Sequence, residues 1–229
     1  MKYVILFLFV FCKSFSQNDS NFVIEGITLN CEKNNYDSRE RYVKLKANNE
    51  IIQENIKQRF GEFKIKNLKK GEYTFEFTNI FGQIITKNIV VNEKITKVEL
   101  CTEEFVDTNQ KTILENLTQN DTLEISITSS GCFHFEKEKI KYYYKSQKLI
   151  AEYFNNQKKE KRITLNERKR EQLILLEKKI IAINNSMGGC TSSTQYVFIL
   201  NGKAIQNVVD SSCDWDGYYK MKEEIFGIK

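Results

Sequence analysis

The chain has 229 residues, with 35 basic and 30 acidic side chains, six cysteines, one histidine and no proline. Its composition, 41% hydrophobic and 28% charged, excludes a disordered chain and a multi-span membrane protein. A single histidine also excludes every metal site that needs two or three imidazole ligands, while the length suits one large domain or two small ones.

The first sixteen residues have the pattern of a secretory signal peptide. A positively charged start precedes nine apolar residues, and small residues stand three and one positions before a cleavage point after Ser16. We expect residues 1–16 to be removed and the mature chain to begin at Gln17, because nine apolar residues are too few for a membrane-spanning anchor. Loss of two lysines with this leader lowers the net charge from +5 to +3, which is too small to predict binding to nucleic acid.

The end of this leader, Ser-Phe-Ser-Gln, resembles exported proteins of gram-negative bacteria. We therefore expect an exported protein of the periplasm, the cell surface or the medium, and all three compartments are oxidising. A lipoprotein anchored through Cys12 is the alternative, but lipid attachment requires a small residue before the cysteine, where Phe11 stands.

The segment from Phe22 to Cys101 consists of short β-rich runs separated by turn residues. In one run, Tyr73, Phe75 and Phe77 alternate with polar residues, which is typical of a half-buried strand. The expected strands are Phe22–Leu29, Tyr42–Lys46, Ile51–Gln53, Phe63–Lys66, Tyr73–Thr78, Gln83–Val91 and Thr96–Cys101. Seven short strands without a credible helix predict a small β-sandwich.

Two motifs in this segment point to a family. The strand start Gly61-Glu62-Phe63 is followed by Leu68-Lys69-Lys70-Gly71-Glu72-Tyr73. Together they resemble the Gly-x-Phe and Leu-x-x-Gly-x-Tyr motifs of the carboxypeptidase regulatory-like domain. The resemblance covers residues 22–102 and implies a seven-stranded, prealbumin-like (transthyretin-like) sandwich with no chemistry of its own. The zinc enzyme that accompanies this domain in metallocarboxypeptidases needs two histidines and a glutamate, so a chain with one histidine cannot contain it.

Cys31 and Cys101 lie at the ends of the first and last expected strands. In many sandwiches these two strands are parallel neighbours, which would bring the two cysteines together. We therefore expect a disulfide between them, worth about 4 kcal/mol in the loop-entropy model. Two buried free thiols are the alternative.

The C-terminal half has a different pattern. Residues 103–120 are polar and are expected to form a linker, and residues 121–229 are expected to form an α+β domain of unknown role with the order β-β-β-α-β-β-α. Its expected strands are Leu123–Thr128, Cys132–Tyr144, Lys148–Phe154, Gln195–Leu200 and Lys203–Val209, and its expected helices are Asn166–Ile183 and Gly217–Phe226. The chain as a whole is thus expected to be mainly β.

The dipeptide Asn201-Gly202 is a strong signal for a two-residue hairpin turn. With that turn, Phe198 faces Ile205, and the same register places Cys190 opposite Cys213. Directly opposed strand positions suit a disulfide, so we expect a second bridge between these two cysteines. Alternatively, the glycines before Cys190 end the strand early and the symmetry is accidental.

Cys132 and His134 stand two apart in an expected strand, with Phe133 and Phe135 expected to anchor that strand in the core. A thiolate–imidazole pair could serve as a nucleophile, and zinc could in principle bind these two residues with Cys190 and Cys213. Side chains two apart in a strand rarely reach each other, however, and a buried thiol is inert. We expect a structural, unpaired Cys132 and no catalytic residue.

A weak calcium candidate lies near the C-terminus. Asp214, Asp216 and Glu223 occupy ligand positions of a loop of the EF-hand type, with Ser212 where the first aspartate belongs. The alternative is that Asp216 caps the last helix. No cofactor and no metal are therefore expected.

The densest basic segments are Lys158–Arg162 and Arg168–Arg170, preceded by Tyr142–Tyr144 and Tyr153-Phe154. They suit an anionic partner such as lipopolysaccharide or an acidic glycan, or else a solvated turn and an exposed helix face. We expect an exported, non-enzymatic binding protein whose partner is a protein or an envelope glycan. The alternatives are a small extracellular enzyme using Cys132 and His134, or a periplasmic inhibitor or immunity-type protein.

Overall fold

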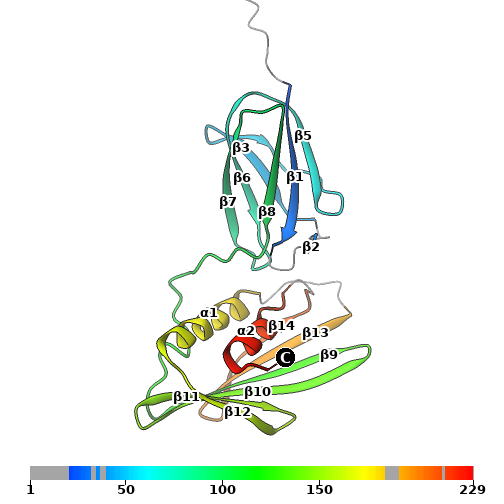
Figure 1. Cartoon of the computed structure of the whole chain (residues 1–229). Coiled ribbons are helices and arrows are strands. Elements are labelled where there is room, and N and C mark those ends of the chain that lie inside the picture. The colour runs from blue at the N-terminus through cyan, green and yellow to red at the C-terminus, as the bar shows by residue number, and fades with distance from the viewer. Residues whose placement is uncertain (1–20, 32–34, 37–39, 184–190, 213–214, 229) are drawn as a thin grey trace, which may run out of the picture.

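The computed structural model describes residues 21–31, 35–36, 40–183, 191–212 and 215–228 (Figure 1). Within these ranges the chain forms three β-sheets and two helices, so the expectation of a mainly-β fold is confirmed. The N-terminal strands are β1 (Phe22–Asn30), β2 (Asn35–Tyr36), β3 (Val43–Ala47), β4 (Glu50–Gln53), β5 (Glu62–Leu68), β6 (Gly71–Thr78), β7 (Ile84–Val91) and β8 (Ile95–Cys101). Each of the seven predicted strands has a counterpart here, and β2 is an addition.

These strands form two four-stranded sheets around one core. In the first, β1 pairs with β2 and β5 on one side and runs parallel to β8 on the other, and in the second the order is β4-β3-β6-β7. Ile24 and Phe63 of the first sheet share a buried cluster with Leu45, Phe75 and Phe77 of the second. Apolar residues of β1, β3, β5, β6, β7 and β8 fill this core, whereas the residues of β4 are exposed.

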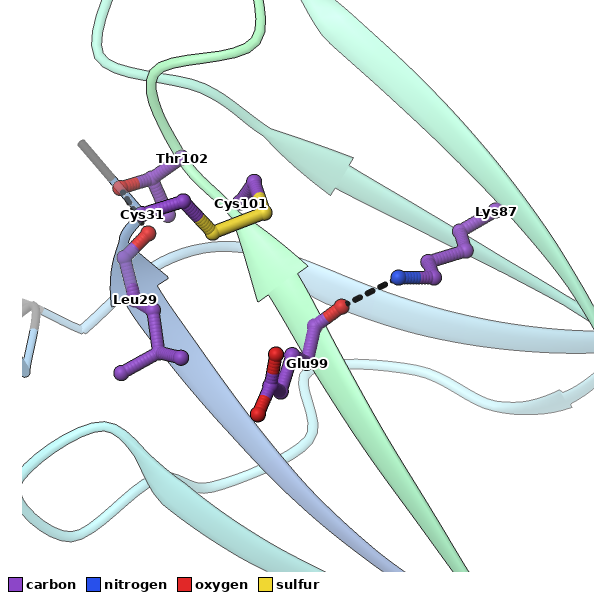
Figure 2. Close-up of a disulfide and its surroundings, with 6 residues drawn as sticks. All are labelled: Leu29, Cys31, Lys87, Glu99, Cys101 and Thr102. Atoms are coloured by element: carbon purple, nitrogen blue, oxygen red, sulfur yellow. Dashed lines mark hydrogen bonds between the residues drawn. A yellow bond between two sulfur atoms is a disulfide. The ribbon is translucent and has the colours of Figure 1, made fainter. Parts of the chain in front are cut away.

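The predicted disulfide between Cys31 and Cys101 is present, with the two Cα atoms 5.3 Å apart (Figure 2). It closes the end of the parallel β1–β8 pair, where Leu29 is the register partner of Cys101. Next to it, the backbone N–H of Thr102 donates to the Leu29 carbonyl at 2.8 Å. The bridge therefore ties the start of this unit to its last strand.

The C-terminal half is built on a six-stranded antiparallel sheet with the order β12-β11-β10-β9-β13-β14. Its elements are β9 (Thr122–Gly131), β10 (His134–Lys145), β11 (Lys148–Asn155), β12 (Lys158–Thr164), α1 (Glu167–Ile183), β13 (Ser192–Leu200), β14 (Lys203–Asp210) and α2 (Gly217–Phe226). Leu173 and Ile180 of α1 and Phe226 of α2 share one buried cluster with Ile125 and Ile127 of β9. Both helices thus cover the same face of the sheet.

Four strands precede α1, where three were predicted. The missed strand is β12, whose side chains are nearly all exposed. Asn156 and Gln157, with φ of 46° and 68°, form the two-residue turn that leads into it. Two consecutive residues with positive φ suit a hairpin turn, and asparagine tolerates that conformation without glycine. Charged side chains on an edge strand prevent it from pairing with other chains. The strand therefore has the polar composition of a loop, which is why the sequence pattern does not predict it.

The Asn201-Gly202 turn is present, but the predicted hairpin register is wrong beyond it. Leu200 pairs with Lys203 as expected, whereas an irregularity between Phe198 and Ile199 makes Phe198 the partner of Gln206 rather than Ile205. Because of this one-residue shift, the register of the hairpin does not place position 190 opposite position 213 as predicted. Both cysteines lie outside the described residues.

The expected linker contributes to the C-terminal core through Leu114 and Leu117, which are both buried. The buried carboxylate of Glu177 on α1 accepts backbone N–H groups of Ile113 and Leu114 at 2.6 and 3.1 Å. Burial raises the pKa of Glu177, and these two bonds oppose that rise.

Neither described helix is long and apolar enough to cross a membrane.

Candidate binding face

One face of the six-stranded sheet is covered by neither of the two helices in the described part of the chain. Side chains alternate between the two faces of a strand, so residues next to the helix-facing Ile125 and Ile140 point the other way. We call that side the outer face. The strand register places Lys141 beside Glu152 and Glu152 beside Arg162, so β10, β11 and β12 all contribute charged side chains to it.

A row of lysines runs along β10 on the outer face. Lys137, Lys139 and Lys141 alternate with helix-facing residues, which places neighbouring lysines roughly 7 Å apart along the strand. Lys159 and Arg162 of β12 extend the positive surface across the sheet, each with side chains at least 40% exposed. The outer face therefore presents ammonium and guanidinium groups from two strands.

Two carboxylates lie among these cations. Glu124 of β9 pairs with Lys139 at 3.1 Å and with Lys141 at 3.8 Å. Glu152 of β11 lies 3.3 Å from the Nζ of Lys159 and 3.7 Å from the Nε of Arg162. The five named cations outnumber the two carboxylates, so the network leaves a net positive charge while holding the long side chains in place.

Aromatic rings of the outer face lie next to these cations. The Nζ of Lys139 is 4.9 Å from the centroid of Phe154, and the Nζ of Lys137 is 5.3 Å from that of Phe135. Tyr143 donates its hydroxyl to Glu152 at 3.1 Å, and burial together with that carboxylate raises its pKa. Contacts of this kind orient a cation without neutralising it.

The tip of the β9–β10 hairpin carries exposed aromatic side chains. Phe133 is 102% exposed and Phe135 is 64% exposed, so the expectation that they anchor the strand in the core is wrong. Figure 1 shows the closed end of this hairpin extending past α2. Phe133 lies in the hairpin turn, and Phe135 lies on the outer face, away from the helices, so alternation along the strand does not lead to burial.

Cys132 and His134 do not form the expected same-face pair. Cys132 is an exposed, free thiol in the hairpin turn, and β10 begins only at His134. The Nε2 of His134 lies 3.1 Å from the hydroxyl oxygen of Ser129. Its ring lies against Gly131, where a Cβ would be 2.6 Å from the ring carbon Cε1. The expectation that Cys132 is a buried thiol is therefore wrong.

The calcium candidate is not assembled by the described residues. Asp216 is the N-cap residue of α2, makes no side-chain cap hydrogen bond and lies 3.4 Å from Lys220. Glu223 lies within α2, while Asp214 lies outside the described part of the chain. Among the residues that the structure describes, no group of three or more histidine, cysteine, aspartate or glutamate side chains could hold a metal ion.

A buried charge cluster fixes α2 to the sheet. The Nζ of Lys222 lies 2.8 Å from the carboxylate of Glu138, which also accepts the hydroxyl of Tyr153. The same ammonium lies 5.3 to 6.0 Å from the rings of Tyr153, Tyr218 and Tyr219. Burial raises the pKa of both Tyr153 and Tyr218. Because Glu138 and Lys222 are each less than 10% exposed, we assign them a structural role.

The N-terminal unit carries an open groove of about 860 Å³ across β1, β5 and β8. Its lining mixes both signs of charge, and Lys64 and Glu25 within it form a pair at 2.6 Å. This groove therefore favours no class of ligand by charge.

The basic segments singled out in the sequence divide between two faces. Lys159 and Arg162 lie on the outer face, whereas Lys169 of α1 donates to the carbonyl of Ile225 on the helix side. Sequence reasoning missed the lysine row of β10, although its Glu-Lys-Glu-Lys-Ile-Lys alternation within a strand is the signal.

Comparison with known proteins assigns no family, since no family model and no curated protein matches the chain.

Proposed function

We propose that the chain is an exported, non-enzymatic binding protein of a gram-negative bacterial envelope, and that its outer face binds an anionic partner. The observation that carries the proposal is the lysine row Lys137, Lys139 and Lys141, extended by Lys159 and Arg162 across an uncovered sheet. Side-chain and ring contacts hold these cations in position before any partner arrives, which reduces the entropy that binding must overcome.

The Cys31–Cys101 disulfide supports export, because such bridges persist in oxidising compartments. The N-terminal sheets support the remaining part of the proposal. Two four-stranded sheets around one core fit a prealbumin-like sandwich of the carboxypeptidase regulatory-like kind, a domain without chemistry of its own. In this proposal that sandwich spans residues 22–102 and carries the α+β domain of residues 121–229, which does the binding.

Replacing Lys137, Lys139 and Lys141 together by glutamine is expected to weaken binding to a soluble polyanion about ten-fold, since each exposed ion pair is worth roughly 0.5 kcal/mol. The measurement is the salt concentration at which the mature protein elutes from immobilised dextran sulfate. The matched control changes three exposed lysines of the N-terminal unit, Lys66, Lys69 and Lys70, to glutamine. An equal loss in this control would show that net charge alone governs retention and would refute a binding face.

A further inference from the structure

The β9–β10 hairpin combines two features on one strand. Its lysine row Lys137, Lys139 and Lys141 is preceded along the chain by the exposed rings of Phe133 and Phe135. Phe135 has Ser130 as its register partner and Lys137 has Thr128, so both lie on the outer face. The lysines and the ring of Phe135 are therefore presented on the same side of one hairpin, next to the turn that carries Phe133.

The rings at the tip contribute little to the packing of the fold. Phe133 is 102% exposed and Phe135 is 64% exposed, and phenylalanine is among the side chains that interfacial segments insert into a membrane surface. A soluble polyanion would neutralise the lysines but would offer these rings nothing apolar. An anionic bilayer offers both, because its headgroups attract lysines and its interface accommodates aromatic side chains.

The shape of the neighbouring surface agrees with a flat partner. On the outer face of β9, the register partners of Lys139, Lys137 and Phe135 are the small hydroxyl residues Ser126, Thr128 and Ser130, while Lys141 lies opposite Glu124. They leave the longer lysine and aromatic side chains as the most prominent groups of the hairpin. Such a surface can lie against a plane with several cations in contact at once.

We propose that the partner of the outer face is an anionic lipid bilayer, with the lysine row on the headgroups and Phe133 and Phe135 entering the interface. This inference rests on the proposed function. Each lysine near an anionic surface is worth about 1 kcal/mol, or roughly five-fold in the partition coefficient. Insertion of an aromatic ring adds to this by removing apolar surface from water.

The test is co-sedimentation of the mature protein with vesicles of phosphatidylcholine containing phosphatidylglycerol, and with phosphatidylcholine alone. We expect binding only to the anionic vesicles. The change of Lys137, Lys139 and Lys141 to glutamine should lower the partition coefficient about hundred-fold. The double change Phe133→Ser and Phe135→Ser should lower it at least about ten-fold. The control Phe60→Ser removes a ring that is 73% exposed on the N-terminal unit and should change nothing.

Insertion is tested separately with Phe133→Trp. Brominated acyl chains in anionic vesicles should quench the indole introduced at position 133, whereas Trp215, packed against Phe81 and Tyr196, should give no such signal in the unmodified protein. Thermal unfolding of each variant is measured as well, and a cooperative transition shows that the variant is folded.

The outcomes separate the two proposals. Retention on dextran sulfate without vesicle binding, or vesicle binding that the two serine changes leave intact, overturns the bilayer as partner and favours a soluble acidic glycan. If the unmodified protein neither binds the anionic vesicles nor is retained on dextran sulfate, the proposed function is overturned as well.

Discussion

Replacing Cys31 and Cys101 together by serine is expected to lower the free energy of unfolding by about 4 kcal/mol. The bridge closes a loop with a sequence separation of 70 residues, so its loss restores much conformational entropy to the unfolded chain. It also joins the ends of β1 and β8, the only parallel pair in the described sheets, and parallel pairs are slightly weaker than antiparallel ones.

Urea denaturation followed by far-ultraviolet circular dichroism measures this effect. The matched control is Cys132→Ser, which removes an exposed free thiol and should leave the free energy of unfolding within about 0.5 kcal/mol of the unmodified value. A loss below about 1 kcal/mol in the double variant would mean that the two strands hold together without the bridge.

The second large effect is expected from Lys222→Met, which should cost about 3–5 kcal/mol. The change leaves the carboxylate of Glu138 buried without its cation, and an uncompensated buried charge is strongly destabilising. Adding Glu138→Gln removes that charge while keeping an oxygen that can accept the hydroxyl of Tyr153. The double variant should therefore recover at least about 1 kcal/mol of the loss.

A double-mutant cycle on the free energy of unfolding measures this coupling. Lys220→Met is the matched control on the same helix, because its side chain is 37% exposed and its pair with Asp216 lies near the surface. That variant should lose less than about 1 kcal/mol. If the single change Lys222→Met were equally mild, the buried pair would have no structural role.

Much of the fold follows from local sequence patterns. Seven of the eight N-terminal strands are recognisable because β-rich runs, several of them alternating, lie between turn residues, and Cys31 and Cys101 stand at the ends of two of them. The helix α1 is recognisable because Leu173, Leu176 and Ile180 repeat at helical spacing and are all buried. In these elements the period of the pattern and the burial agree.

Other features depend on contacts distant in sequence. The irregularity between Phe198 and Ile199 shifts a hairpin register, and the alternation of the sequence does not mark it. Glu138 and Lys222 are 84 residues apart, so their pairing is visible only in the folded chain. Phe133 is exposed because it lies in the β9–β10 turn, before β10 begins at His134, and the apolar pattern of the sequence does not mark that boundary.

The candidate site was predictable only in part. Lys159 and Arg162 stand out in the sequence as a basic segment, but their strand was missed because its composition is that of a loop. The lysines of β10 are dispersed among glutamates in the sequence, and only the alternation of faces in a strand separates them. A mixed-charge segment thus becomes a positive face once its register is known.

Lysine footprinting tests the central claim, that the outer face is the binding surface, most directly. Protein without residues 1–16 is acetylated with and without anionic vesicles, and modification of each lysine is measured by mass spectrometry. If the outer face binds the vesicles, Lys137, Lys139 and Lys141 are protected from acetylation. Lys66 and Lys70 of the N-terminal unit then react at an unchanged rate. Protection of the N-terminal lysines with free reaction along β10 would contradict it.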